Sequence, residues 1–178
     1  MISGFNGEYA FLSNMYPCEI ETNLGIFKSS EHLYQWLKVL NTQGGLWWKE
    51  KIKEAVHGKV AKKLAANPKC PKVENFYEDE KIRLKFMVTV IHVKFTKNEE
   101  LKEKLWNTGD EELVETNYWN DTFWGVCNGV GRNMLGKLLM NNRHFHRDFH
   151  RDFTIHPIED IENWYSCKDG WKPYYRKL

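Results

Sequence analysis

The clearest hydrophobic pattern in the chain begins at residue 33. Four apolar residues recur at the i, i+3, i+4, i+7 spacing of one buried helix face: Leu33, Trp36, Leu37 and Leu40. Ser29 or Ser30 stands just before them, where a hydroxyl can accept a hydrogen bond from a free amide of the first turn. The pattern therefore predicts an amphipathic helix that begins near Ser30 and ends at Gly44-Gly45.

Apolar spacing predicts more helices downstream, over about residues 47–56, 59–66, 79–95 and 99–106 and again from Met134. The segment 79–95 is ambiguous because Val88–Ile91 is a β-branched run, which is typical of strands. Its length and its lack of Gly and Pro favour a helix. Turns and short strands are expected before residue 30 and a strand near Leu113–Thr116, which together predict a mostly helical α+β domain.

The composition limits the class of protein. A chain of 178 residues with 42% hydrophobic and 28% charged residues fits one compact domain and excludes a disordered chain. Without a long apolar run or a basic leader, we expect neither a membrane span nor a signal peptide. Four scattered cysteines read as free thiols in a reducing compartment, so a cytoplasmic protein is expected.

The last part of the chain differs in composition from the rest. A His-Arg-Asp-Phe segment at 146–149 is repeated at 150–153, and aromatic residues such as Trp164 and Trp171 follow. We therefore expect one domain over residues 1–143 and an extension over 144–178 that packs on it. The spacing of His144, His146 and His150 can hold a metal, but an alternating charged surface repeat is the favoured interpretation.

Glu31 is the first candidate for chemistry. It lies near the start of the predicted helix, on the side opposite the apolar stripe, together with Gln35 and Lys38. One interpretation is a solvated polar face with a first-turn carboxylate favoured by the helix dipole. The other is a carboxylate that stabilises a developing cation or positions a water molecule, with a cation one turn away.

A second candidate is the aromatic segment 117–125. It places four large aromatic residues around Asp121 and ends at Gly125, an arrangement suited to a planar base attached to a sugar. The alternative is an aromatic turn over the core in which Asp121 forms a local Asx turn. The glycines at 129–136 do not complete a dinucleotide fingerprint, because Met134 stands where its third glycine would be.

Several sequence blocks occur together in a fixed order. They are FLSNMYP at 11–17, SEHLYQ at 30–35 with Lys38, Lys94-Phe95 with Asn98, TGD at 108–110 with Leu113 and Glu115, Asp121 with Trp124-Gly125, and GRNMLG at 131–136 with Leu139-Met140. With these blocks, residues 5–143 resemble the NADAR, or YbiA-like, family. The resemblance implies a compact α+β domain with N-glycosidase activity, needing neither a metal nor a cofactor.

The resemblance also implies roles for particular residues. Glu31 matches the active-site glutamate of the family. The pocket positions of the family are matched by Asn14, Lys38, Asp121, Trp124 and Asn133. The family usually has a tryptophan shortly before the methionine that is Met87 here, and this chain has none between Trp48 and Trp106, so its base specificity is expected to differ.

These residues lead to a mechanistic hypothesis. Glu31 would stabilise an oxocarbenium-like ribose and orient water, and Asp121 would protonate the leaving base or hold its exocyclic groups. Lys38 and Lys94 would bind a sugar phosphate, Trp124 would form a wall against the base, and Asn14 and Asn133 would bond hydroxyls or phosphate.

The substrate would be a phosphoribosyl or ADP-ribosyl small molecule. Two alternatives remain open: a module that binds ADP-ribose or a nucleotide without cleaving it, and a remover of ADP-ribose from nucleic acid or protein. A net charge of +2 does not by itself favour nucleic acid.

Overall fold

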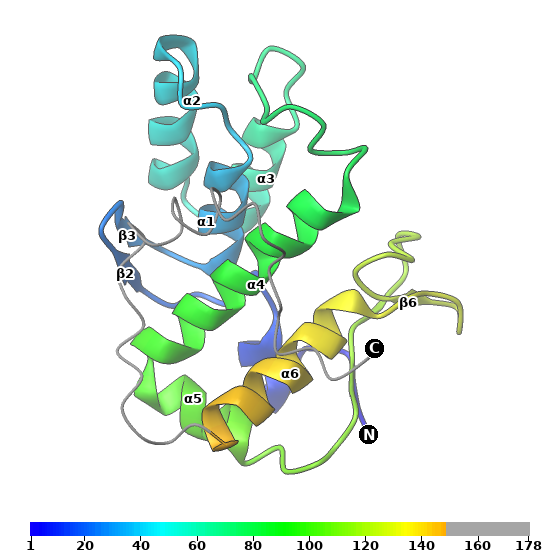
Figure 1. Ribbon diagram of the computed structural model, residues 1–178. Helices are drawn as coiled ribbons and strands as arrows, with labels where there is room; N and C mark the ends of the chain where they lie inside the picture. The colour runs from blue at the N-terminus through cyan, green and yellow to red at the C-terminus, as the bar shows by residue number, and fades with distance from the viewer. Residues whose placement is uncertain (149–178) are drawn as a thin grey trace, which may run out of the picture.

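The computed structural model (Figure 1) describes residues 1–148 of the chain. Its helices are η1 (Gly7–Leu12, a 3-10 helix), α1 (Ser30–Leu37), α2 (Gln43–Glu54), α3 (Gly58–Ala65), α4 (Glu80–Lys97), α5 (Glu99–Trp106) and α6 (Met134–Asp148). Its strands are β1 (Ile2–Ser3), β2 (Ile20–Thr22), β3 (Gly25–Phe27), β4 (Leu113–Val114), β5 (Thr116–Asn117) and β6 (Val126–Cys127). The expected α+β class, mostly helical with a few short strands, is confirmed.

Helix α4 is the element on which the rest is assembled. Figure 1 shows it running diagonally through the molecule, with α1, α2 and α3 above it and α5 and α6 below it. It packs directly on α1, α5 and α6, and α1 in turn packs on α2 and α3. Residues of α1 and α4 that face each other are therefore enclosed by elements distant in the sequence.

The strands form three small sheets within the described residues. β2 and β3 make an antiparallel hairpin in which Ile20 faces Phe27, and both of these side chains are fully buried. β1 pairs in parallel with β4, and β5 pairs in parallel with β6. These parallel pairs are only two residues long, so they join neighbouring loops rather than build a sheet. The β5–β6 pair brings the two ends of the aromatic segment 117–125 together.

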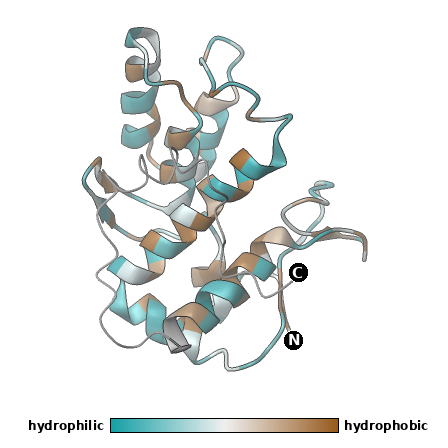
Figure 2. Ribbon diagram, viewed as in Figure 1, coloured by the Kyte–Doolittle hydropathy of each residue, from teal (hydrophilic) through white to brown (hydrophobic). Residues whose placement is uncertain are grey.

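The β-branched run in α4 shows packing overriding propensity. Val88–Ile91 lies inside α4, where Val90 and Ile91 are fully buried. Figure 2 shows apolar positions recurring along the whole of α4. A helix that buries residues against several neighbours gains more from packing than a β-branched run loses in helix propensity, which amounts to a few tenths of a kcal/mol per residue.

Two details of the predicted first helix are wrong. α1 ends at Leu37, so Leu40 lies outside it and is partly exposed. Gly44 and Gly45 do not end a helix but open α2: the Thr42 hydroxyl accepts a hydrogen bond from the Gly45 amide at 3.2 Å. A Cβ at Gly45 would collide with the Leu40 carbonyl, which explains a glycine in the first turn.

The predicted extension lies mostly beyond the described residues. α6 continues from Met134 to Asp148 and crosses the predicted boundary at residue 143 without a break. The domain division therefore stays a prediction. The part of the repeat from residue 149 on, the aromatic residues after it and His150, the last histidine of the H-x-H-x3-H spacing, lie outside the residues that the structure describes.

Candidate active site

Helix α1 carries Glu31 into the interior. The Ser29 side chain caps the helix by accepting from the His32 amide, so the first turn starts where the sequence predicts. Residues 30–35 are all buried, and Glu31 and Gln35 retain only 6% and 3% of their exposure. The interpretation of this side as a solvated polar face is therefore wrong: α1 is enclosed on both sides.

The Glu31 carboxylate is held in one orientation. Oε1 accepts a hydrogen bond of 2.6 Å from Nε2 of Gln35, one turn further on. The backbone amide of Glu31 donates to the Asn14 carbonyl at 2.9 Å, which ties α1 to the loop after η1. Behind it, a Cβ on Gly58 would lie 3.0 Å from the Glu31 Cβ. Within residues 1–148 the second carboxylate oxygen, Oε2, has no hydrogen-bond partner and is available to a ligand.

Lys38 and three aromatic rings lie next to this carboxylate. The Lys38 ammonium is 4.3 Å from the centre of the Tyr34 ring and 5.1 Å from that of Phe76. Trp124 packs edge-on against Tyr34 with ring centres 5.9 Å apart. Burial lowers the pKa of Lys38 to about 8, while the charge of Glu31 acts in the opposite direction. A desolvated cation, a carboxylate and aromatic walls therefore meet at one place.

The electrostatics of Tyr34 connect the two candidate segments. Burial raises the pKa of its phenol above the ordinary range, and the charges of Glu31 and Asp121 raise it further. Both carboxylates are thus close enough to Tyr34 to act on the same group. The structure brings Glu31, Lys38, Asp121 and Trp124 together, as the sequence-based hypothesis requires.

Asp121 is also a turn former. Its Oδ1 accepts from the amides of Phe123 at 3.2 Å and Trp124 at 2.9 Å. Asn117 holds it from both sides, donating to its carbonyl at 2.8 Å and accepting from its amide at 3.0 Å. The two interpretations of Asp121 are compatible, because the Asx turn uses one carboxylate oxygen and fixes the position of the other.

Three residues near the site have no role in the sequence-based hypothesis: Tyr34, Arg83 and Glu115. Glu115 is largely buried, and burial together with the charge of Asp121 raises its pKa to about 7. Its Oε2 has no partner within the described residues. Glu115 belongs to one of the sequence blocks that resemble the family. Its possible role in chemistry becomes visible only in the fold, which places it close to Asp121.

Two predicted substrate-binding residues are occupied by backbone groups. Lys94 is buried, and its Nζ donates to the carbonyls of Phe11 at 2.5 Å and Ser13 at 2.9 Å. The Asn133 side chain donates to the Leu113 carbonyl at 2.8 Å and accepts from the Glu115 amide at 3.0 Å. Both side chains anchor loops around the site through these bonds, so their observed contacts are structural.

Asn14 is placed at the edge of the site. Its amide donates to Sδ of Met87 at 3.1 Å, a weak acceptor that a substrate oxygen could replace. Met87 is fully buried, and no tryptophan stands on the preceding turns of α4. The aromatic rings next to Lys38 on this side of the site are Tyr34 and Phe76, whose ring centres are 6.2 Å apart.

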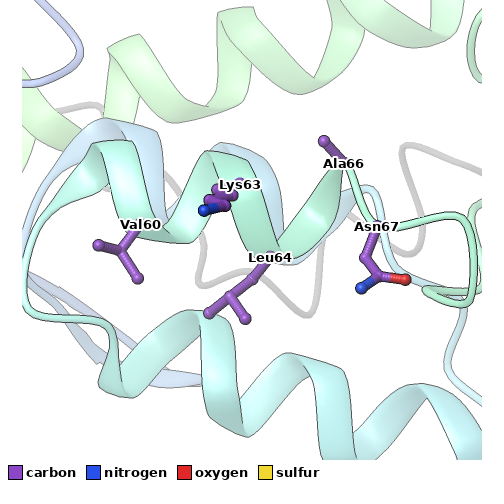
Figure 3. A pocket seen from close by; sticks show the side chains of 5 residues that line it. All are labelled: Val60, Lys63, Leu64, Ala66 and Asn67. Carbon is purple, nitrogen blue, oxygen red and sulfur yellow. The ribbon is translucent and has the colours of Figure 1, made fainter.

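A separate hollow lies on α3. Figure 3 shows it lined by Val60, Lys63, Leu64, Ala66 and Asn67, all from α3 and the residues just after it. It contains no carboxylate and none of the residues discussed above. Within residues 1–148, His, Cys, Asp and Glu side chains nowhere gather as a metal site would require. None of the described helices has the length and hydropathy of a membrane span.

Comparison with known proteins places this geometry in a family. The NADAR domain matches residues 4–146. A riboflavin biosynthesis protein of Vibrio vulnificus is 35% identical over 133 residues, which are 74% of this chain but only 34% of that protein. An N-glycosidase YbiA of Shigella flexneri is 31% identical over 137 residues, covering 76% of this chain and 81% of that protein.

A solved structure shares the fold. The NMR structure of Escherichia coli YbiA superposes with a TM-score of 0.71 at 26% identity, over 87% of this chain and 90% of that chain. The expected enzyme class, an N-glycosidase, is the one for which several of these relatives are named. The match over residues 4–146 and the shared fold establish that this chain belongs to the NADAR domain family.

Proposed function

We propose that this protein hydrolyses the bond between ribose C1′ and a base nitrogen of a phosphorylated ribosyl or ADP-ribosyl substrate. The observation that carries the proposal is the Glu31 carboxylate, which is buried, oriented by Gln35 and left with one unbonded oxygen. A carboxylate in such a site stabilises positive charge far better than one in water. The names of the relatives support the same reaction class.

The proposed reaction needs charge stabilisation at the sugar and a proton at the base. As the C1′–N bond breaks, its electron pair leaves with the base nitrogen and the ribose becomes oxocarbenium-like. Glu31 faces that charge and orients a water molecule whose oxygen forms the new bond to C1′. The water proton passes to the carboxylate, and the base nitrogen receives a proton from an acid.

Asp121 and Glu115 are the groups we assign to the leaving base. Burial raises the pKa of Glu115, and the charge of Asp121 raises it further, to about 7, so Glu115 still holds a proton part of the time near neutral pH. The Asp121 oxygen not used in the turn is fixed near Tyr34 and Trp124. We infer that Asp121 delivers the proton or holds exocyclic groups, and that Glu115 resupplies the proton.

The other residues of the site position the substrate. Trp124 and Tyr34 form edge-on walls for a planar base, and Asn14 can turn its amide from Met87 to a ribose hydroxyl. Lys38 supplies a cation for a phosphate. Since the Vibrio relative is named a riboflavin biosynthesis protein, a phosphoribosylamino-pyrimidine is the first substrate to test.

The test compares Glu31→Gln with Glu103→Gln, an exposed glutamate on α5, a helix that carries none of the residues assigned to the site. Phosphoribosylamino-pyrimidine, NAD and ADP-ribosylated DNA and protein are incubated in parallel, and released base and sugar are measured. We expect Glu31→Gln to lower kcat by about 10²–10⁴-fold and Glu103→Gln to leave it unchanged. Near-full turnover by folded Glu31→Gln would refute the mechanism, and binding without any product would indicate a binding module.

A further inference from the structure

An arginine of α4, Arg83, lies at the edge of the site and forms no ion pair with a carboxylate of the part of the chain that the structure describes. The Nε of Arg83 is buried and has no hydrogen-bond partner within residues 1–148. Its guanidinium lies over the Phe123 ring, with Cζ 4.3 Å from the ring centre. An unpartnered buried donor is costly and uncommon in folded proteins, so the conformation of Arg83 requires an explanation.

The nearest carboxylate on the same helix is already occupied. Glu80 stands one turn before Arg83, but both of its oxygens accept from Arg132, at 2.7 Å from Nη1 and 2.6 Å from Nη2. Arg132 also lies near the Phe123 ring, at 5.0 Å. This two-pronged ion pair keeps Glu80 from neutralising Arg83. Among the described residues, the hydrogen bonds of Glu80 therefore go to Arg132 and not to Arg83.

Three residues on one face of α4 differ in whether their polar atoms have hydrogen-bond partners. Arg83, Met87 and Lys94 recur at spacings of four and seven residues, which place them on one face of the helix. Met87 accepts from Asn14, and Lys94 donates to the two carbonyls described above. Only Arg83, at the site end of this row, has no such partner among the described residues.

A continuous set of contacts joins Arg83 to Lys38. Phe123, under the guanidinium, packs on Trp124 with ring centres 4.8 Å apart. Trp124 packs on Tyr34, and the Lys38 ammonium lies over the Tyr34 ring, 4.3 Å from its centre. Consistently, the positive charge of Arg83 helps to lower the pKa of Lys38, as do those of Lys62 and Lys72. Cations thus outnumber Glu31 on this side of the site.

We propose that Arg83 and Lys38 form the phosphate-binding site and that Arg83 selects phosphorylated over unphosphorylated ribosyl substrates. The proposal rests on the proposed function and replaces Lys94 by Arg83 as the second phosphate ligand. A guanidinium held over the Phe123 ring presents its N–H groups as a fork to two phosphate oxygens, while Lys38 adds a point charge. The bound anion supplies the acceptor that Nε lacks.

The test measures binding of ribose 5-phosphate and of ribose by calorimetry, so it does not depend on turnover. Arg83→Gln is compared with Lys81→Gln, an exposed α4 residue whose replacement changes the net charge equally. We expect Arg83→Gln to weaken ribose 5-phosphate binding by about 10- to 100-fold and Lys81→Gln to leave it unchanged. Ribose should bind weakly to all three proteins.

A conservative variant keeps the inference testable if Arg83→Gln fails to fold. Arg83→Lys retains the charge but loses the fork and the stacking, so we expect about a tenfold weaker affinity. Affinity equal to wild type in a folded Arg83 variant, or equal binding of ribose and its phosphate by wild type, would overturn the phosphate site.

The two proposals fail in different ways. If ribose 5-phosphate binds through Arg83 but no substrate is hydrolysed, the N-glycosidase proposal is wrong and the phosphate site stands. If hydrolysis proceeds equally well with unphosphorylated substrate, the glycosidase stands and the phosphate site is wrong. If both hold, Arg83→Gln should raise KM for phosphorylated substrate by about 10- to 100-fold with kcat little changed.

Discussion

The role of Lys94 can be decided by replacing it with methionine, which has a similar length and no charge. Burial lowers the pKa of Lys94 from 10.5 to about 8. Between these two pH values the unfolded chain holds the proton and the folded chain releases it. The stability contributed by position 94 therefore rises as the pH increases, at up to about 1.4 kcal/mol per pH unit.

The expected size follows from the shift. Integrated from pH 7 to 9.5, the free energy of unfolding of the wild type should gain about 2 kcal/mol relative to Lys94→Met. The offset at pH 7 combines two lost charge-assisted hydrogen bonds with the relief of a buried charge, so its sign is less informative than the slope. Cys18 interacts with Lys94 and titrates nearby, so both proteins should carry Cys18→Ser.

The assay is urea unfolding followed by tryptophan fluorescence at several pH values. A difference between the two proteins that stays constant within about 0.5 kcal/mol over this range would refute the reasoning. The folded Lys94→Met protein should also bind ribose 5-phosphate normally. A loss of that affinity, with no change in the pH dependence of stability, would return Lys94 to the substrate site.

Four other substitutions and conditions test the site. Gly58→Ala should lower kcat/KM about tenfold, because the new Cβ would lie 2.8 Å from Met15 Sδ and would displace Glu31; steady-state kinetics measure this. Asn133→Ala should cost about 2–4 kcal/mol in urea unfolding while leaving KM unchanged, since its two buried hydrogen bonds are to the backbone. Binding of ribose 5-phosphate should weaken above pH 8, as free Lys38 with a pKa of about 8 loses its proton; calorimetry across pH 7–9.5 checks it. Glu115→Gln should remove any decline of kcat/KM near pH 7 in the pH–rate profile, because the group with a pKa of about 7 is gone.

Much of the fold follows from local signals in the sequence. The spacing of apolar residues predicts both ends of α3, α4 and α5 to within a few residues and the start of α6, and the Ser29 cap marks the start of α1. These signals act between residues a few positions apart, so the sequence displays them directly. Gly44-Gly45 was misread because a glycine pair can end one helix or permit close contact at the start of another.

For the candidate site too, the sequence indicates some features and only the tertiary structure decides others. The sequence by itself identified Glu31, Lys38, Asp121 and Trp124, through their spacing and the order of family blocks. Only the tertiary structure decided that Glu31 is buried rather than solvated, because α3 and the loop after η1 cover the polar side of α1.

The three-dimensional arrangement also decided between the cations. Lys94 and Arg83 are both basic residues of α4, and no local pattern distinguishes them. Two backbone carbonyls from residues more than eighty positions away accept hydrogen bonds from Lys94. Glu80 instead pairs with Arg132, and the Nε of Arg83, over the Phe123 ring, has no hydrogen-bond partner among residues 1–148. Burial and the pairing of charges depend on contacts between distant segments, and the sequence alone does not contain their geometry.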